Sequence, residues 1–130
     1  MKFLNRWGLV IIWMGVIYIG SANRDPFLVV PESVTVPHEK IGQVAHVLEY
    51  AVLAILFGRA VLDGGKIDSK SAIQIVFFSF SYGLFDEIHQ SWIPERAFQL
   101  LDLGLDVIGS MIGVGYCRWC SRKESTKGKK

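Results

Sequence analysis

The sequence predicts an all-α fold, a polytopic membrane bundle of four transmembrane helices. The 130-residue chain is 51% hydrophobic and has a mean hydropathy of +0.34, which is too apolar for an ordinary soluble domain of this length. Its charged residues gather at the two ends and in a few short stretches instead of spreading over a surface. Each apolar run between them is close to the roughly 20 residues that a helix needs to cross a bilayer.

Four spans follow one another along the chain. The first, at about residues 4–22, and the last, at about 98–119, are convincing apolar runs. The second, at about 41–62, is of similar length but includes ionisable residues. The third, at about 72–89, includes a glutamine, two serines and a tyrosine, so it has to bury a polar stripe against its neighbours.

The connections predict how the spans are arranged. Residues 23–40 form the only sizeable loop, and its three prolines exclude regular helix. The link at 63–68 is a short glycine-containing turn, in which Asp68 or Ser69 is expected to cap the third helix. The link at 91–97 is also short, so the second, third and fourth spans should be antiparallel neighbours.

Lysine and arginine predict the orientation. With both termini in the cytoplasm, all of these residues except Arg24, Lys40 and Arg96 lie on the inside, as the positive-inside rule requires. The basic tail at residues 120–130 is then cytoplasmic and is expected to bind anionic lipid, not nucleic acid. The first span also resembles a signal peptide ending at Ala22, but its aromatic residues interrupt the usual aliphatic core and favour an uncleaved span.

Polar residues at one depth are the main functional clue. Three spans place ionisable groups in their outer halves at helical spacing, and ionisable groups at membrane depth usually mark a functional site. We therefore expect one shared anionic pocket that opens outward, with Arg96 in the last link as its counter-charge. The other candidate pocket residues are His46, Glu49, Tyr50, Asp86, Glu87, His89, Gln90, Asp102 and Asp106.

These residues carry a resemblance to a known family. The pattern Lys40…His46-x-x-Glu49-Tyr50, Asp86-Glu87-x-His89-Gln90, Pro94-x-Arg96 and Asp102…Asp106-x-x-Gly109-x-x-x-Gly113 is similar to that of the VanZ-like family. Two departures stand out: Asp106 replaces a common Asn, and Lys40 lies further from His46 than usual.

The resemblance implies a small bacterial protein of the cytoplasmic membrane, with a single domain at residues 1–119. Some members lower susceptibility to glycopeptide antibiotics, and the family is named for an accessory factor of teicoplanin resistance. The expected partners are therefore the lipid bilayer, a glycopeptide antibiotic or a lipid-linked cell-wall intermediate. The family supplies no established reaction, so the mechanism has to be argued from the residues.

Several chemical roles remain open at the pocket. A divalent metal such as zinc or manganese could bind His46 and His89 with Glu49, Asp86 or Asp102, and the alternative is a structural network of hydrogen bonds and ion pairs. Carboxylates beside a histidine could also serve an enzyme acting on a lipid-linked or peptidoglycan precursor. No serine or cysteine lies in a recognisable nucleophile motif, which favours a binding role over catalysis. A structural or partner-binding subunit is a third alternative.

Two short motifs have simpler interpretations. Gly109 and Gly113 form a G-x-x-x-G motif, which lets helices pack closely within one chain or between copies in a homo-oligomer. Cys117 and Cys120 form a single C-x-x-C on the predicted cytoplasmic side, and two reduced, inert thiols are the favoured interpretation.

Overall fold

Four helices make up the computed structural model, which describes residues 2–22, 38–62, 65–94 and 96–127, without the side chains of residues 2–5, 38 and 124–127. They are α1 (Lys2–Ala22), α2 (His38–Leu62), α3 (Ser69–Gln90) and α4 (Leu100–Lys127). No strand occurs in these ranges, so the predicted all-α class is confirmed.

Several helix boundaries differ from the predicted ones, and α3 begins at Ser69, three residues before the predicted span. α2 begins at His38, three residues before the predicted span, and α4 continues through most of the predicted basic tail to Lys127. The tail stays helical because it has no proline or glycine before Gly128 and is rich in lysine and arginine, which are good helix formers. The rest of the predicted loop, residues 23–37, and residues 63–64 of the predicted turn lie outside the described residues.

The start of α3 has the predicted cap. The Asp68 side chain accepts a hydrogen bond from the Ser71 backbone N–H at 2.8 Å, which satisfies one of the unpaired donors of the first turn. The hydrogen bonds from Ser71 also hold the pKa of the Asp68 carboxyl below its ordinary value. Of the two predicted candidates, Asp68 is therefore the residue that caps the helix.

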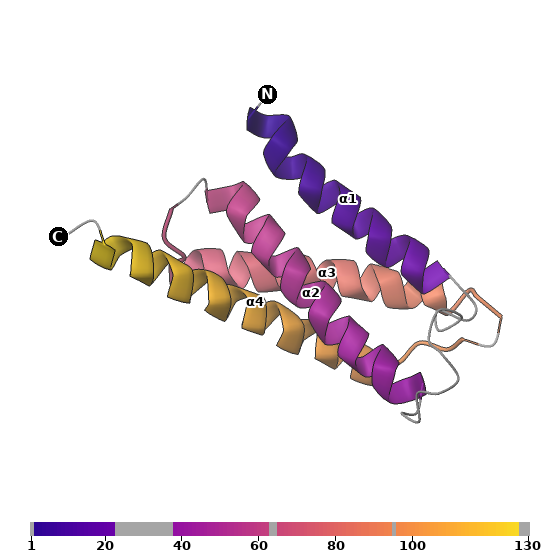
Figure 1. Cartoon of the computed structure of the whole chain (residues 1–130). Helices are drawn as coiled ribbons and strands as arrows, with labels where there is room; N and C mark the ends of the chain where they lie inside the picture. The colour runs from indigo at the N-terminus through magenta and orange to yellow at the C-terminus, as the bar shows by residue number, and fades with distance from the viewer. Residues whose placement is uncertain (1, 23–37, 63–64, 95, 128–130) are drawn as a thin grey trace, which may run out of the picture.

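The helices run antiparallel to their chain neighbours, with α2 crossing the middle of the bundle (Figure 1). α2 packs most extensively against α4. A side chain at Gly109 or Gly113 would collide with the backbone carbonyl of Val47 or Ala51 on α2. The G-x-x-x-G motif thus lies inside the bundle and lets the α2 and α4 backbones approach closely.

Two apolar clusters form the core. Val10 and Ile17 of α1 pack against buried side chains of α2, and Ile75 of α3 packs with Val114 of α4. The Phe57 and Phe78 rings stack with their centroids 3.9 Å apart, which joins α2 to α3. This apolar packing fixes how each helix is rotated, and the rotation decides which polar side chains meet.

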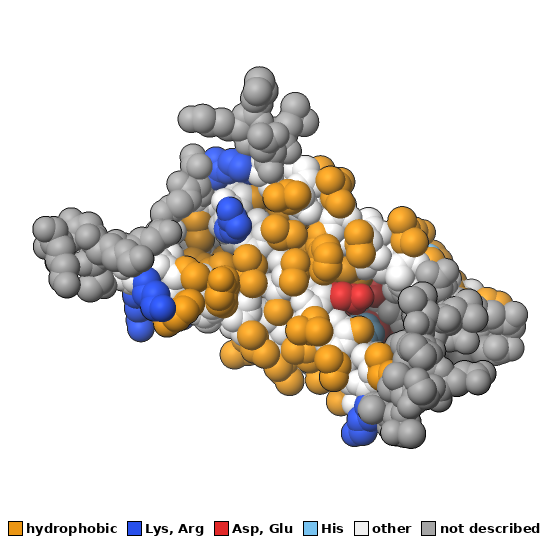
Figure 2. Space-filling model, viewed as in Figure 1, with side chains coloured by type: hydrophobic (Ala, Val, Ile, Leu, Met, Phe, Trp, Pro, Cys, Tyr) orange, Lys and Arg blue, Asp and Glu red, His pale blue; other side chains and the backbone are white. Residues whose placement is uncertain are grey.

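The outside of the bundle is also apolar. Ile12, Ile73, Phe77 and Met111 are each at least 60% exposed, an amount of exposed apolar surface that suits lipid better than water. Figure 2 shows hydrophobic side chains covering much of one face, with lysine and arginine mainly at one end. Among the described residues, α2 and α4 have helical stretches of 24 residues that include 18-residue windows with mean hydropathies of 1.7 and 1.5, long and apolar enough to cross a membrane. The described apolar part of α1 is shorter.

Candidate functional site

The polar side chains gather at one end of the bundle. This end holds the last turns of α1 and α3, the first turns of α4 and the first half of α2 (Figure 1). α1 begins and α4 ends at the opposite end. The candidate residues therefore lie at one end of the bundle, but helix rotation divides them into two groups.

The first group lies between α2, α3 and α4, and we call it the acidic cluster. Its members are His46, Glu87, Asp102 and Asp106. The His46 Nδ1 atom lies 2.8 Å from Asp106 Oδ1, and its Nε2 atom lies 3.7 Å from Asp102 Oδ2. The backbone N–H of Gln99 donates to Glu87 Oε2 at 2.8 Å and fixes that carboxylate beside the start of α4.

Two oxygens of the acidic cluster have no partner. Glu87 Oε1 and Asp106 Oδ2 are buried and make no hydrogen bond within the described structure. An unpaired buried carboxylate oxygen is costly because the charge has lost water without gaining a donor. The cluster therefore has the capacity to accept a cation or donor groups from a ligand.

Gly83 makes room for the acidic cluster. A side chain at this position of α3 would collide with the Asp106 carboxylate. Because Gly83 has no side chain, the Asp106 carboxylate of α4 can pack against the α3 backbone while it is hydrogen-bonded to His46 of α2. Gly83 is one helical turn before Glu87, so the two residues lie on the same face of α3.

The second group joins α1, α3 and the α3–α4 link, and we call it the Ser21–Arg96 network. It comprises Ser21, Asp86, Gln90 and Arg96. The Ser21 hydroxyl donates to Asp86 Oδ1 at 2.5 Å, and Gln90 Nε2 donates to Asp86 Oδ2 at 2.9 Å. Both carboxylate oxygens of Asp86 therefore have partners, and this network is closed.

Arg96 has a different role from the predicted one. Its guanidinium donates to the Ser21 carbonyl at 3.0 Å and to Gln90 Oε1 at 3.2 Å. It makes no ion pair with a carboxylate in the described part of the chain, and its link to Asp86 runs through Gln90. The expectation that Arg96 directly neutralises the acids is corrected: it braces the last turn of α3 against α1.

The remaining candidate residues, His89, Glu49 and Tyr50, each contact α1 through a side chain or the backbone. The His89 ring stacks on Tyr18 with centroids 4.3 Å apart, and its buried Nδ1 atom has no partner. The backbone carbonyl of Glu49 accepts a hydrogen bond from Trp13 Nε1 at 2.9 Å. The Glu49 carboxylate interacts electrostatically with His46, Asp86 and Asp106, members of both polar groups. Tyr50 is fully buried in the α1–α2 core with its hydroxyl unpaired.

The arrangement could hold a metal ion, although with a different residue set from the predicted one. Ligand atoms of His46, Glu87 and Asp102 lie within 4.8 Å of one another. Of the predicted ligands, His46 and Asp102 belong to this group, whereas His89, Glu49 and Asp86 do not. Glu87 is a candidate pocket residue that the sequence did not single out as a metal ligand.

Three contributors were missed at the sequence level: Ser21, Gly83 and the Gln99 backbone. The i, i+3, i+4 relation of Gly83 to Asp86 and Glu87 is a signal that could have placed it on the polar face. Ser21 is the last small polar residue of an apolar run, and nothing in the sequence identifies its partner.

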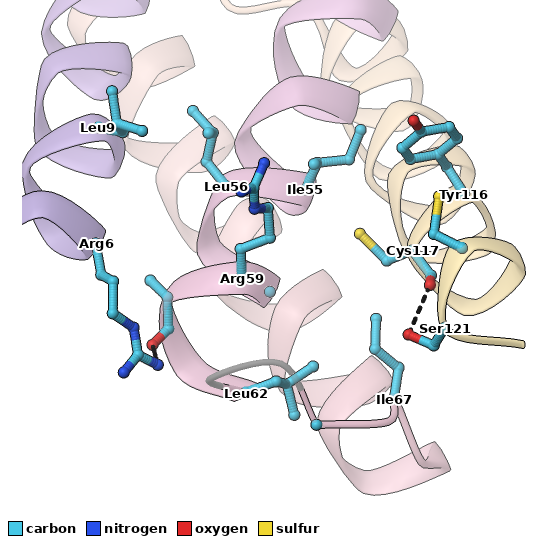
Figure 3. Close-up of a pocket in the computed structure, with 14 residues that line it drawn as sticks. Arg6, Leu9, Ile55, Leu56, Arg59, Leu62, Ile67, Tyr116, Cys117 and Ser121 are labelled. Carbon is cyan, nitrogen blue, oxygen red and sulfur yellow. Dashed lines mark hydrogen bonds between the residues drawn. The ribbon is translucent and has the colours of Figure 1, made fainter. Parts of the chain in front are cut away.

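A cavity of about 590 Å³ lies at the opposite end of the bundle. Arg59 reaches into it from α2, while Tyr116 and Cys117 of α4 lie on the other side (Figure 3). Cys117 and Cys120 carry free thiols. No carboxylate lines this cavity among the described residues, so it is chemically unlike the acidic cluster.

Comparison with protein-family models places the chain in a known family. A family model described as VanZ/LLP1 matches residues 6–121, which is most of the chain and includes both polar groups. No curated protein and no solved structure matches the chain.

Proposed function

This chain belongs to the VanZ/LLP1 family, and on that premise we propose that it is a bacterial cell-envelope membrane protein whose acidic cluster binds a ligand and contributes to tolerance of glycopeptide antibiotics such as teicoplanin. The observation that carries this proposal is the acidic cluster itself. Three helices bring together a histidine from α2 and buried carboxylates from α3 and α4, and two of the carboxylate oxygens lack partners. A purely structural network would be expected to pair them.

The proposal includes a topology. All four helices cross the cytoplasmic membrane, both termini are cytoplasmic, and the acidic cluster opens toward the outer surface. The antiparallel order of the helices and the apolar exterior support this arrangement. The distribution of lysine and arginine supports the orientation. The lower hydropathy of α3 is accommodated because its polar residues Ser79, Asp86 and Glu87 are buried against other helices.

Exposure at the acidic cluster supports a ligand-binding role. The side chains of His46 and Asp102 are 14% and 11% exposed, so the cluster is reachable from the surface. Figure 2 shows acidic side chains, with a histidine close beside them, in a gap of an otherwise hydrophobic face. An amide-rich or cationic group of a peptide antibiotic offers the donors that these oxygens lack.

A second candidate function is an enzyme acting on a lipid-linked or peptidoglycan precursor. One observation favours it. Asp106 holds Nδ1 of His46 at 2.8 Å, and a carboxylate that orients an imidazole is typical of a general base.

The test is teicoplanin susceptibility in a sensitive host that expresses the chain. We expect Glu87→Gln and Asp102→Asn to return the minimal inhibitory concentration to that of the host without the chain. Both substitutions remove a carboxylate charge and nearly preserve the side chain's shape. The matched control is Glu39→Gln, an exposed carboxylate at the start of α2.

Equal amounts of each variant in the membrane fraction have to be established first. Wild-type tolerance in both cluster variants would overturn the proposal, as would the absence of tolerance with the wild-type chain. Loss of both variants from the membrane, with Glu39→Gln retained, would favour a structural network.

A further inference from the structure

We infer that the acidic cluster is a binding site for a divalent transition-metal ion, with His46, Glu87 and Asp102 as its protein ligands. This inference rests on the proposed function only in assigning the acidic cluster as the ligand-binding site. It identifies the ligand held by the protein as a cation and names the atoms that hold it.

The donor set is suitable in kind and position. One imidazole nitrogen and two carboxylates come from α2, α3 and α4, and their ligand atoms lie within 4.8 Å of one another. Donor atoms around a tetrahedral zinc ion with bonds of about 2.0–2.2 Å lie roughly 3.4 Å apart, so closure needs side-chain movements on the order of 1 Å. Three protein ligands leave one position open for water or a further ligand.

Asp106 is hydrogen-bonded to the ring nitrogen of His46 that would not bind the metal, as is usual for metal-binding histidines. Its Oδ1 atom is 2.8 Å from His46 Nδ1, so in the neutral ring Nδ1 donates to Asp106 and the lone pair of Nε2 remains available. That nitrogen is on the side of Asp102, at 3.7 Å from Oδ2. A carboxylate that fixes the tautomer and orientation of a histidine is a recurrent feature of metal sites.

The state of Glu87 distinguishes a metal site from a group of acidic side chains that merely lie close together. Its side chain is completely buried, one oxygen is held by the Gln99 backbone, and the other has no partner. The residue is therefore already oriented and still has an available acceptor. A divalent cation would balance the charges of Glu87 and Asp102 together, which His46 alone cannot do.

The ligand types favour a transition metal over calcium or magnesium. Calcium and magnesium are bound by oxygen ligands and waters, whereas imidazole together with carboxylates suits zinc and related ions. Zinc is therefore the first probe, and manganese is the second because it tolerates more carboxylate character.

The experiment is calorimetric titration with Zn²⁺ and, separately, Mn²⁺. The full chain is purified in mild detergent and stripped with a chelator. All forms include Cys117→Ser and Cys120→Ser, which removes thiols that bind zinc on their own. We expect one ion per chain. His46→Ala and Glu87→Gln should each weaken binding at least about 100-fold, and Asp106→Asn about 10- to 100-fold.

His89→Ala is the matched control, since it removes another imidazole at the same end of the bundle but outside the three-ligand group. Its affinity should stay within about 2-fold of the parent chain, given that ligand and supporting residues carry the affinity. Unchanged circular dichroism and elution volume would show that each variant is folded. The metal site would be overturned if the parent chain bound neither zinc nor manganese. It would also be overturned if Glu87→Gln left binding unchanged, or if His89→Ala abolished it.

The metal site and the proposed function can fail separately. Tolerance lost in Glu87→Gln, with no ion bound by the parent chain, would keep the acidic cluster as a ligand site and reject the metal. A stoichiometric ion lost in Glu87→Gln, with tolerance unchanged, would keep the metal and reject the role in glycopeptide tolerance.

Discussion

Asp86 and Glu87 are consecutive acids near the end of α3, yet they belong to two different kinds of site. Their exposed fractions are almost equal, at 2% and 0%. Asp86 faces α1, where Ser21 donates to one of its oxygens, and Gln90 of α3 itself donates to the other. Glu87 faces α4, where one oxygen accepts from a backbone N–H and the other has no partner.

The difference separates polar groups that hold the fold from polar groups that await a ligand. A closed network satisfies every member and stabilises the helix packing around it. An open cluster keeps unsatisfied acceptors at some cost in stability, which is common where a protein binds something. Burial alone does not distinguish the two, but the inventory of partners for each oxygen does.

The largest expected effect comes from opening the closed network. Asp86→Ala leaves Ser21 and Gln90 without their shared acceptor, and we expect the free energy of unfolding to fall by about 2–4 kcal/mol, because each buried polar group left unpaired costs about 1–3 kcal/mol. Glu87→Gln should cost less than about 1 kcal/mol, since the amide oxygen can still accept from Gln99 and a charge with an unsatisfied oxygen is removed. Denaturant unfolding in mild detergent measures both.

The control is the matched pair Asp86→Asn and Glu87→Ala, which exchanges the mild and severe changes between the two positions. A Glu87→Gln chain as unstable as Asp86→Ala would show that both acids are structural, and the contrast between the two groups would disappear.

An intermediate loss of stability is expected for a substitution at Gly83 of α3, the helix that contributes residues to both polar groups. Gly83→Ala places a methyl group against the Asp106 carboxylate, so that carboxylate has to move away from α3. We expect a loss of about 1–3 kcal/mol in the free energy of unfolding, the usual cost of overpacking, together with weaker support for His46.

The matched control is Gly104→Ala on α4, where an added methyl group meets nothing within 4 Å. That substitution should leave stability unchanged or slightly raised, because alanine favours helix over glycine by about 1 kcal/mol. Equal unfolding midpoints for the two variants would contradict the close approach of Asp106 to α3.

The fold class could be predicted because it depends on hydropathy and turn residues. Apolar runs separated by short polar links define four helices, and Asp68 is recognisable as a cap from its residue type and place. The end of α4 could not be predicted from hydropathy, since a charged stretch can remain helical after the apolar run has ended. The sequence also predicted that the polar residues share one depth, which depends only on chain direction.

The division of the candidate site could not be predicted. Neighbouring positions on a helix differ in direction by about 100°, so Asp86 and Glu87 must face different partners. Which partners they meet depends on how α3 is rotated against α1 and α4, and that rotation results from apolar packing across helices. Arg96 illustrates the same limit: its charge suggested a carboxylate partner, whereas its position in the link leads it to the Ser21 carbonyl and Gln90.

Within the closed network, the smallest expected effect is at Arg96, at its edge. Arg96→Met retains an apolar stem but removes the donors to the Ser21 carbonyl and Gln90 Oε1. We expect the free energy of unfolding to fall by about 1 kcal/mol, because these bonds are only partly buried and water can replace the guanidinium.

Combining Arg96→Met with Gln90→Ala should cost less than the sum of the single changes, since the two residues contact each other. A loss as large as that of Asp86→Ala would instead show that Arg96 acts directly as the counter-charge of the buried acids, and the Ser21–Arg96 network would then be held by charge neutralisation more than by its hydrogen bonds.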